Sequence, residues 1–488
     1  ALYFGVRSIV KVTDSTFFNN KATKGGGAIF ADSIELSIDT VLFHKNIVTD
    51  GDGGAIHITS VDAGSVLHFR TLITQNNEAR GGGGALFMRG GKATIEGATQ
   101  AFGDTATGTD GGGFLLARAA TIDIADALFV ATKATKGAGG VVVAIGSSLD
   151  IKNSVFDSAV SKQGSGGAII TRLCDIKIAN SSFINNLAVG NNYVGQSWGG
   201  ALAFTSRTTG IIKSTTFDQN KVMMQMWGGT ERIGGAAGAV SCDGCAGLTI
   251  LSSTFTKNIA GRAGAVMLFN VNSATSVIIN NSSFIENEAT SGGGGAIFWN
   301  EYYPLLDTAT WNLKNGNKAL YRNFIGSAPA SVSLSGWKSP EELNGQQGGI
   351  LVHVANSDDV GVLAVTNTKA FSPMINLLDH ATAHDNGQPV VDHDASERYV
   401  VYASCKNATL FGEAEALVSI NGTAKYVGLG LSARPGRYIL ELKASGAGVV
   451  QQYVAVQVAD CPAGRYLKAA GASFSCTDCA VGYYSDAL

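Results

Sequence analysis

A repeat of about 27 residues constrains the fold of this chain more than any other feature of its sequence. Ten times, an aromatic or aliphatic lead residue is followed three positions later by Asn or a small residue, and then by a Gly-Gly-Ala-Ile-like step. The lead residues are Phe17, Phe43, Ile73, Phe102, Phe129, Phe156, Phe183, Phe217, Phe255 and Phe284. They advance by 26, 30, 29, 27, 27, 27, 34, 38 and 29 residues, and a near-fixed period of this size predicts a solenoid.

The segments between these markers predict which kind of solenoid forms. Helical repeats need apolar residues at a period near 3.6 and contain few glycines. Here short segments such as 33–39, 120–124 and 276–279 mostly alternate apolar with polar residues, and Gly, Asn, Asp, Ser and Thr separate them. Three short strands and three turns fill about 27 residues. We therefore expect an all-β chain whose residues 1–335 form a right-handed parallel β-helix of about eleven coils.

The lead aromatic residues and the Asn residues are expected to form two columns through the coils. Each Phe stacks on the Phe of the next coil, and each Asn joins an amide ladder that satisfies buried amides through the coils on either side. The clearest members of the columns are Phe17, Asn20, Phe43, Asn46, Phe183, Asn186, Phe217, Asn220, Phe255, Asn258, Phe284 and Asn287. The ladder should be interrupted in the middle of the solenoid, where Thr105, Thr132 and Ala159 replace Asn.

The first residues look like the inside of a coil. Ala1-Leu2-Tyr3-Phe4 is similar to Ala28-Ile29-Phe30, but no glycine pair precedes it. An open coil exposes strand edges and core, so a solenoid needs a cap. We therefore expect a piece of a longer protein, and a processed terminus is the alternative.

After about residue 320 the repeats fade and a different pattern begins. Residues 350–458 tend to alternate with period two and contain turn signals such as Asn421-Gly422 and Pro435-Gly436. This spacing predicts a small antiparallel β-sandwich, which we place at residues 345–459. A segment that contains three cysteines, residues 460–488, follows it.

The repeat unit itself is similar to that of a known family. Phe-x-x-Asn paired with Gly-Gly-Ala-Ile/Leu/Val resembles the repeat of the polymorphic outer membrane proteins of chlamydiae, which also occurs in surface proteins of algae and other protists. The resemblance covers roughly residues 1–330, although several copies depart from it, as at Gly112-Gly113-Phe114-Leu115. It implies a secreted, surface-displayed adhesive or architectural protein and names no ligand.

Two further resemblances concern the C-terminal part. Residues 424–431 and 436–442 resemble strands of immunoglobulin-like modules. Cys461-Pro-Ala-Gly-x-Tyr466, Cys476-x-x-Cys479 and the Gly-Tyr-Tyr-Ser at 482–485 resemble the first half of the cysteine-rich modules of ephrin-type receptors. That resemblance implies a disulfide between Cys461 and Cys476, and a partner for Cys479 beyond the last residue. It would account for the odd total of seven cysteines.

Cysteine usage predicts an oxidising compartment. The cysteine-rich segment and the short Cys242-Asp-Gly-Cys245 loop both favour disulfides, with Cys242 and Cys245 as a pair. Zinc is the competing interpretation, because Cys242/Cys245 and Cys476/Cys479 have ligand-like spacing, but no second knuckle with proper spacing exists. Cys174 and Cys405 have no obvious partner.

Five glycosylation sequons agree with secretion. Such triplets mark surface positions in a secreted eukaryotic protein, although they also arise by chance in Ser/Thr-rich chains. The acceptor residues are Asn180, Asn280, Asn281, Asn407 and Asn421.

Composition excludes several partners. The formal net charge is -3 and 15% of residues are charged, so the chain carries no electrostatic footprint for nucleic acid. No apolar run is long enough to cross a membrane, and no motif for a cofactor is present. The expected partners are other copies of the chain, or other extracellular surface proteins and glycans.

An enzyme on this fold would need carboxylates grouped on adjacent coils. Parallel β-helices include polysaccharide lyases and hydrolases, which place two or three acidic groups, or an acidic group with Arg or Lys, on the outer face. Here the carboxylates are interpreted as single, turn-flanking or solvent-facing groups. They are Asp39, Glu96, Asp123, Asp126, Asp150 and Asp175. The sequence therefore predicts no enzyme and no catalytic residue.

A polar cluster at residues 379–394 contains three histidines and four carboxylates. His380, His384 and His393 are the weak candidates for a Ca²⁺ or Zn²⁺ site. The segment reads as strand, Asp-Asn-Gly turn and strand, which would spread these groups along a hairpin. We favour an exposed polar hairpin without metal.

Two neighbouring coils carry insertions at the same place, between the Asn and the glycine pair. They contain 191–198 and 222–227, and neighbouring coils should present them side by side. Aromatic and Met side chains are enriched at protein interfaces, so one apolar patch could form there. Its members would be Tyr193, Trp198, Met223, Met224, Met226 and Trp227. The equally weighted alternative is that the loops bury each other.

The function that these features favour is structural. We expect a non-enzymatic, glycosylated repeating unit of an extracellular coat, adhesion array or filament, on a cell surface and by analogy a flagellar one, as in the hair-like filaments (mastigonemes) of algal and protist flagella. The second hypothesis is a receptor or adhesin ectodomain that binds glycan or protein through the inserted loops. The third is a polysaccharide lyase or hydrolase.

Overall fold

The computed structural model describes two compact units, residues 1–326 and 327–488. The described residues are 2–5, 8–59, 66–191, 197–226, 230–271, 276–300, 302–327, 329–335, 362–365, 374–379, 400–417, 423–426, 429–444, 452–458, 463–470 and 473–480. No helix in these ranges is long and apolar enough to span a membrane. The predicted domain ranges, 1–335, 345–459 and 460–488, stay predictions.

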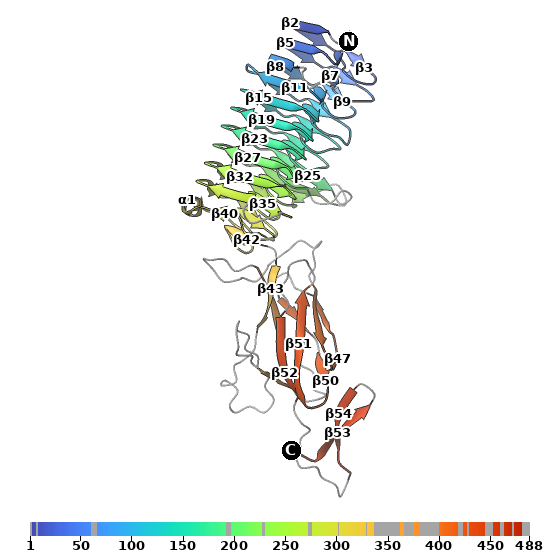
Figure 1. Cartoon of the computed structure of the whole chain (residues 1–488), viewed down its shortest axis with the longest axis vertical. Coiled ribbons are helices and arrows are strands. Elements are labelled where there is room, and N and C mark those ends of the chain that lie inside the picture. Colours follow the sequence, from blue (N-terminus) through green and yellow to red (C-terminus); the bar gives the residue numbers. More distant parts are fainter. Residues whose placement is uncertain are drawn as a thin grey trace. The chain divides into compact units, whose positions relative to one another are not determined.

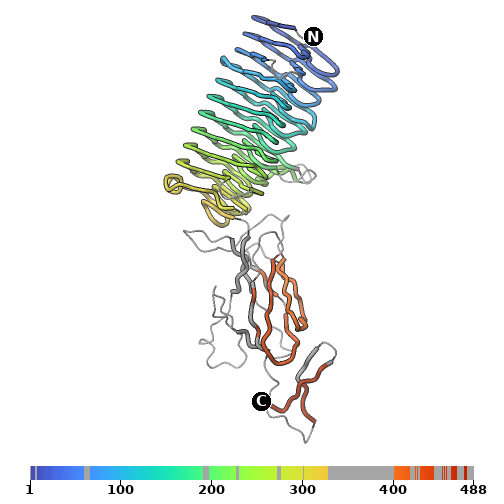
Figure 2. The backbone as a smooth tube through the Cα atoms, viewed as in Figure 1, coloured from blue at the N-terminus to red at the C-terminus, as the bar shows by residue number. Residues whose placement is uncertain are grey.

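The first unit is a parallel β-solenoid of about eleven turns, which confirms the predicted fold class in this form (Figures 1 and 2). Each turn contributes strands to three parallel sheets that run along the solenoid axis. The first sheet, in spatial order, contains β1 (Leu2–Phe4), β4 (Ile29–Asp32), β7 (Ile56–Thr59), β10 (Leu86–Arg89), β14 (Leu115–Arg118), β18 (Val142–Ile145), β22 (Ile169–Arg172), β26 (Leu202–Thr205), β31 (Val240–Asp243), β35 (Val266–Phe269), β39 (Ile297–Trp299) and β42 (Ile325–Ser327).

The second sheet has two limbs that meet at a bend. In the first three coils one strand spans both limbs, and in later coils each limb has its own strand. The members are β2 (Ile9–Phe18), β5 (Glu35–His44), β8 (Val66–Gln75), β11 (Lys92–Glu96), β12 (Gln100–Phe102), β15 (Thr121–Ala125), β16 (Leu128–Val130), β19 (Ser148–Lys152), β20 (Val155–Asp157), β23 (Asp175–Ala179), β24 (Ser182–Ile184), β27 (Thr209–Lys213), β28 (Thr216–Asp218), β32 (Gly247–Leu251), β33 (Thr254–Thr256), β36 (Val277–Asn280), β37 (Ser283–Ile285), β40 (Leu305–Leu306) and β41 (Lys314–Asn315).

The third sheet consists of short strands next to the longer turns. Its members are β3 (Lys21–Ala22), β6 (Ile47–Val48), β9 (Glu78–Ala79), β13 (Thr105–Ala106), β17 (Lys133–Ala134), β21 (Val160–Ser161), β25 (Leu187–Asn191), β29 (Lys221–Gln225), β34 (Ile259–Ala260) and β38 (Glu288–Ala289), with β30 (Glu231–Ile233) pairing antiparallel to β29. The short helix α1 (Thr308–Asn312) has Asp307 as its N-cap, and the Asp307 carboxylate accepts the Thr310 N–H at 2.8 Å.

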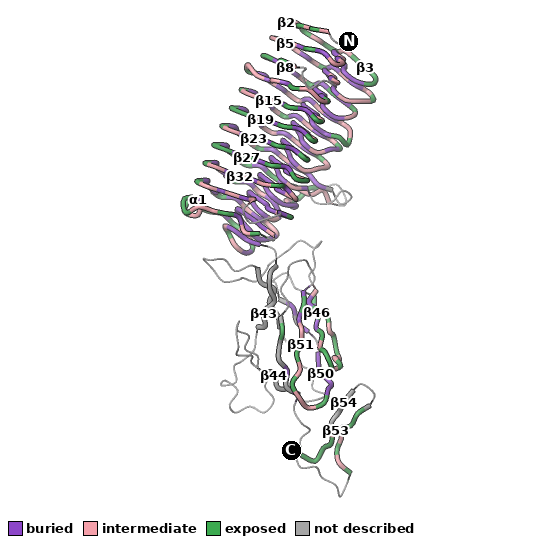
Figure 3. Tube along the Cα trace, in the orientation of Figure 1, coloured by how far each residue is buried: buried purple, intermediate pink, exposed green. Residues whose placement is uncertain are grey.

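The core of the solenoid is its lumen, which alternate residues of most strands fill (Figure 3). Stacked aromatic rings form one column of this core. The centroids of successive rings lie 4.6–5.1 Å apart along Phe129, Phe156, Phe183, Phe217, Phe255 and Phe284. Phe17 and Phe43 stack in the same way at 4.9 Å.

Two of the ten predicted lead positions are wrong by one residue. Phe43 pairs with Thr74 rather than Ile73, Thr74 pairs with Ala101, and Ala101 pairs with Phe129. Because side chains alternate between the two faces of a strand, Ile73 and Phe102 lie on the outer face and are partly exposed. In each case an aromatic or aliphatic residue lies next to the true position, and the prediction selected that residue instead.

A phenylalanine from another wall replaces the missing ring where the aromatic column is broken. In the fourth coil the column residue is Ala101, and Phe114 stands where the repeat has Ala. The Phe114 ring lies 5.0 Å from that of Phe129 and is fully buried. In the eleventh coil Lys314 occupies the column, and Phe324 again stands at the Ala position, 5.9 Å from Phe284.

This exchange of ring positions predicts that substitutions at positions 101 and 114 have strongly non-additive effects on the free energy of unfolding. Phe114→Ala should leave a cavity and lower the free energy of unfolding by about 3–5 kcal/mol. Ala101→Phe alone should also destabilise, because Phe114 occupies the space that the new ring needs. The double variant restores the common repeat and should unfold close to the wild type, as urea denaturation of all four proteins would measure. Additive losses in the double variant would contradict the exchange.

The Asn column forms a hydrogen-bonded ladder on one wall of the lumen. At Asn186, for example, the side-chain Nδ2 donates to Asn220 Oδ1 at 2.9 Å and to Phe156 O at 3.0 Å, while its backbone N–H donates to the same Asn220 oxygen. One run contains Asn20, Asn46, Asn77 and Asp104, and a second contains Asn186, Asn220, Asn258, Asn287 and Asn317.

The break in the ladder differs from the prediction in one respect. Thr132 and Ala159 do interrupt it, but in the fourth coil the ladder residue is Asp104 and not Thr105. The predicted ladder omits Asn77 for the same reason, because the one-residue shift at Ile73 places Asn76 at the ladder position instead. Asn76 is exposed and Asn77 is buried.

The second unit contains small, mainly antiparallel sheets. They are formed by β43 (Pro329–Ser335), β45 (Met374–Asp379) and β49 (Thr423–Lys425); by β44 (Val362–Val365), β52 (Gln452–Val458), β51 (Gly436–Ala444), β46 (Val400–Cys405) and β48 (Glu415–Leu417); by β47 (Thr409–Phe411) and β50 (Gly430–Ser432); and by β53 (Arg465–Ala470) and β54 (Ser473–Asp478). Strand β44 pairs parallel to β52. Tyr426 is buried in the core of this unit and donates to Val401 O at 2.9 Å.

Candidate functional site

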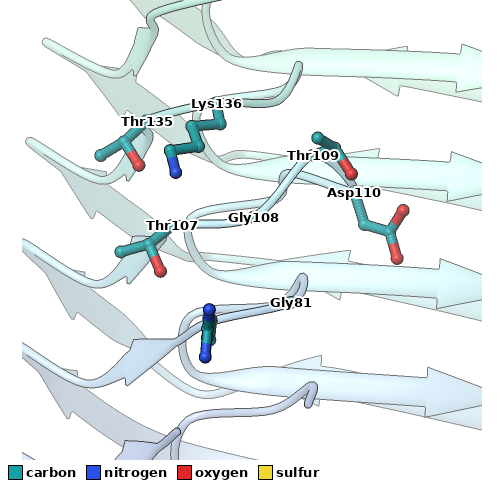
Figure 4. A pocket seen from close by; sticks show the side chains of 8 residues that line it. Gly81, Thr107, Gly108, Thr109, Asp110, Thr135 and Lys136 are labelled. Atoms are coloured by element: carbon teal, nitrogen blue, oxygen red, sulfur yellow. The ribbon is translucent and has the colours of Figure 1, made fainter. Parts of the chain in front are cut away.

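The first candidate site is a surface pocket of about 380 Å³ on three consecutive coils. The turns that follow β9, β13 and β17 form it, and these strands pair in register, so the turns stack directly on one another (Figure 4). The lining residues are Arg80, Gly81, Thr107, Gly108, Thr109, Asp110, Thr135 and Lys136. Figure 4 shows the Lys136 side chain reaching from its own turn toward the turn that carries Thr107.

The charges around this pocket do not cancel. Asp110 forms an ion pair with Arg118 at 2.9 Å. Arg80 and Lys136 have no ion pair within the described ranges, and both are exposed. The pocket therefore presents two cationic groups with available charge beside one carboxylate that is already neutralised.

The pocket also presents hydroxyl groups. Thr107 Oγ1 donates to Ala79 O at 3.3 Å, and Thr135 Oγ1 donates to Ala106 O at 3.4 Å. Since each hydroxyl proton points to a backbone carbonyl of the neighbouring coil, the oxygen lone pairs can accept from a ligand. The sequence analysis missed this site, and a correct coil register is the signal that would have grouped its residues.

The second candidate site is the pair of insertions, which the structure places side by side. Strand β29 pairs with the extended β25 over five residue pairs and with β30 as a hairpin. Met223, Met224 and Met226 are half-buried there. Tyr193 and Trp227 lie outside the described residues.

Trp198 is the described aromatic member of the predicted patch. It is half-buried, and its ring centroid is 6.1 Å from that of Phe269. Its indole Nε1 is buried and has no hydrogen-bond partner among the described residues. Within the described residues, the members of the predicted patch are therefore Trp198, Met223, Met224 and Met226, all of them half-buried, and their role as an interface stays a prediction.

A third feature is the buried carboxyl group of Asp104. Thr74 Oγ1 donates to its Oδ2 at 2.5 Å, and the backbone N–H and Nδ2 of Asn77 donate to its Oδ1 at 2.8 and 2.9 Å. Burial raises the pKa of Asp104 from 3.8 to about 7, and these hydrogen bonds oppose the shift. Thr74 occupies a position of the aromatic column, and Asp104 occupies a position of the Asn ladder. A hydrogen-bonded Thr–Asp pair therefore replaces the usual Phe and Asn at this point.

The carboxylates are less scattered than the sequence suggested. Asp123 and Asp150 are register partners on neighbouring coils, so they lie side by side on the outer face. Lys92 contacts Asp123 at 3.2 Å, and Lys152 contacts Asp150 at 2.8 Å. Each carboxylate thus has its own lysine, which is the pattern of an exposed ion-pair ladder.

The structure describes only some of the cysteines and histidines that the sequence predicts as disulfide or metal-site residues. A disulfide joins Cys242 and Cys245, so neither is a thiolate ligand for zinc. Cys174 is buried with a free thiol, and burial raises its pKa. Cys461, His380, His384 and His393 lie outside the described residues, as does the side chain of Cys476. In the described ranges, no group of three or more His, Cys, Asp or Glu residues could hold a metal ion.

The sequon residues lie mostly at accessible positions. Asn180, Asn281 and Asn407 are exposed, and each adopts a left-handed backbone with φ of 51°, 48° and 65°. Asn280 is half-buried at the end of β36. Asn421 lies outside the described residues.

Comparison with known proteins gives one match. Residues 14–32 match the Chlamydia polymorphic membrane protein repeat, and this range includes Phe17, Asn20 and the Gly26-Gly27 step of the first full coil. Neither a curated protein nor a solved structure matches the chain. The matched repeat, together with the parallel β-solenoid that contains it, indicates a surface or adhesin-like protein.

Proposed function

We propose that the chain is a non-enzymatic extracellular structural protein, a glycosylated repeating unit of a cell-surface or flagellar filament or coat. The observation that carries this proposal is the lumen itself. Runs of stacked phenylalanines and two amide ladders occupy much of it, so we expect the solenoid to be a stiff rod whose outer faces and inserted strands make the contacts.

The insertions β25, β29 and β30 are the proposed contacts between copies. They widen the third sheet, and β30 adds an antiparallel strand to it. A strand at the edge of a sheet offers unpaired backbone groups to another chain, and the nearby Met side chains add apolar area. The alternative is that the same surface belongs to a receptor or adhesin ectodomain that binds a glycan or protein.

An enzyme is the least supported alternative. Asp123 and Asp150 provide neighbouring carboxylates, as lyases and hydrolases of this fold require. Each is held in its own solvent-exposed ion pair with a lysine, which is the arrangement of a surface ion-pair ladder. Turnover of an acidic polysaccharide by the wild type, lost in Asp123→Asn, would favour this alternative.

The proposal includes a finer organisation of the second unit. An immunoglobulin-like sandwich at 345–459 and half of an ephrin-receptor-like module at 460–488 would act as spacers in an oxidising compartment, with Cys461 bound to Cys476. Glycans on Asn180, Asn281 and Asn407 would extend from exposed turns. The antiparallel pairing in these ranges is consistent with such modules.

Self-assembly tests the proposal directly. Size-exclusion light scattering and negative-stain microscopy of the native protein should show regular filaments or sheets. Met223→Gln with Met226→Gln should prevent assembly, whereas the control Leu173→Gln with Ile211→Gln, two exposed apolar residues elsewhere, should assemble normally. A monomer at all concentrations would contradict the filament and favour the receptor or adhesin.

A further inference from the structure

We propose that the pocket after β9, β13 and β17 binds the anionic group of an acidic polysaccharide, a carboxylate or a sulfate ester, together with hydroxyls of the adjoining sugar ring. The inference deepens the proposed surface function, and it rests on that function only for the setting in which the protein meets such a polymer.

The first support is the charge of Arg80 and Lys136. Elsewhere on the solenoid, some cations contact a carboxylate, as in Lys24–Asp50 and Lys92–Asp123. Arg80 and Lys136 face one pocket without such a partner in the described ranges. Arginine binds carboxylate or sulfate oxygens through two parallel N–H groups, and lysine adds a mobile point charge.

The second support is the spacing along the solenoid axis. Glu78, Thr105 and Lys133 are register partners, so Arg80 and Lys136 belong to turns two coils apart. At the spacing of neighbouring strands this separation is roughly 10 Å along the axis. A glycan chain lying along the stacked turns could therefore place anionic groups of alternate sugars near the two cations.

The third support is the chemistry between the two cations. Gly81 and Gly108 line the pocket with backbone alone, and Thr107 and Thr135 supply acceptor oxygens for sugar hydroxyls. The lining residues include no aromatic ring on which a nucleobase could stack. The pocket therefore suits an acidic sugar better than a nucleic acid.

The experiment measures binding of two probes to the full chain by calorimetry. The probes are oligogalacturonate and short dextran sulfate, with neutral dextran as the reference. We expect at least one acidic probe to bind, more weakly as salt increases, and neutral dextran not to bind. Arg80→Gln with Lys136→Gln should weaken binding on the order of ten-fold. Thr107→Val should weaken it about three-fold, because one acceptor is lost.

A charge-matched control separates a built site from general attraction. Lys177→Gln with Lys213→Gln removes the same charge from exposed positions on the second sheet and should leave binding unchanged. Equal weakening in this control would overturn the proposal. Binding of inorganic sulfate or single-stranded DNA as tightly as the acidic oligosaccharide would overturn it too.

The outcome is independent of self-assembly. Light scattering of the Arg80→Gln with Lys136→Gln variant should match that of the wild type, because the pocket lies on coils other than those that carry β25, β29 and β30. A wild type that forms filaments but binds neither acidic probe overturns this inference alone. A monomer that binds them in the predicted way overturns the filament and supports the pocket.

Discussion

Replacing Gly140 with Ala is expected to destabilise the solenoid by more than about 4 kcal/mol, whereas Gly139→Ala should cost only about 1–2 kcal/mol. The two glycines are adjacent members of one Gly-Gly pair. A Cβ on Gly140 would collide with the carbonyl oxygen of Gly167 on the neighbouring coil. Strand pairing on both sides holds that carbonyl in register, so the backbone has little freedom to move away.

Gly139 has a different constraint. Its φ of +64° lies in the left-handed region, and a Cβ would press on Val142 O within the same turn. Ala237 and Ala263 occupy the equivalent position in later coils with φ of 61° and 50°, so this turn can relax around a methyl group.

The second position of the Gly-Gly pair, unlike the first, is occupied by the same residue from coil to coil. It is Gly in ten successive coils, at Gly27, Gly54, Gly84, Gly113, Gly140, Gly167, Gly200, Gly238, Gly264 and Gly295, and a Cβ on each would meet the next coil. Urea denaturation of Gly139→Ala and Gly140→Ala would measure the difference. Equal losses for the two variants would contradict the larger cost that we assign to contact between coils at Gly140.

Asp104→Asn is expected to stabilise the protein above pH 7 and to remove much of its pH dependence between pH 4 and pH 7. The pKa of Asp104 is about 7 in the folded chain against an ordinary value of 3.8. Between these values the folded chain holds a proton that the unfolded chain has released. Raising the pH through this window therefore lowers the free energy of unfolding, by at most about 1.4 kcal/mol per pH unit.

The amide should fit the site without a charge. Its oxygen can accept from Asn77 as the carboxyl oxygen does, and its NH₂ group can donate to the Thr74 hydroxyl. At pH 8 we expect Asp104→Asn to be more stable than the wild type by about 2–4 kcal/mol, and at pH 4 the two should be similar.

Thr74→Val provides the matched control for this prediction. It removes the hydroxyl that donates to Asp104 Oδ2, so the carboxylate loses one of its hydrogen bonds. The loss of stability should be larger at pH 8 than at pH 4, the reverse of the effect of Asp104→Asn. Urea denaturation across the pH range would test both, and a difference that does not change with pH would contradict the buried carboxylate.

Several parts of the fold followed from the repeat alone. The period of about 27 residues and the alternating short strands were enough to predict a parallel β-solenoid of about eleven coils, because only stacking can bury the apolar face of such a short unit. Phe156, Asn186 and their equivalents stand where the spacing puts them, since each coil presents them at the same point.

The residues that depart from the repeat could not be interpreted from the repeat pattern alone. Thr74, Ala101 and Asp104 replace the usual residues, and their meaning depends on which residue of the next coil each one faces. A shift of one residue reverses inside and outside, and the apolar Ile73 and Phe102 beside the true positions concealed that shift.

The sequence by itself therefore determined the architecture of the solenoid, because a repeated pattern encodes the contacts that every coil shares. Only the tertiary structure decided the contacts that occur once. Phe114 enters the space beside Ala101, Asp104 meets Thr74, and Arg80 and Lys136 face one pocket although 56 positions separate them in the chain. Such contacts join residues from different coils, and the register between coils arises only when the backbones of neighbouring strands pair.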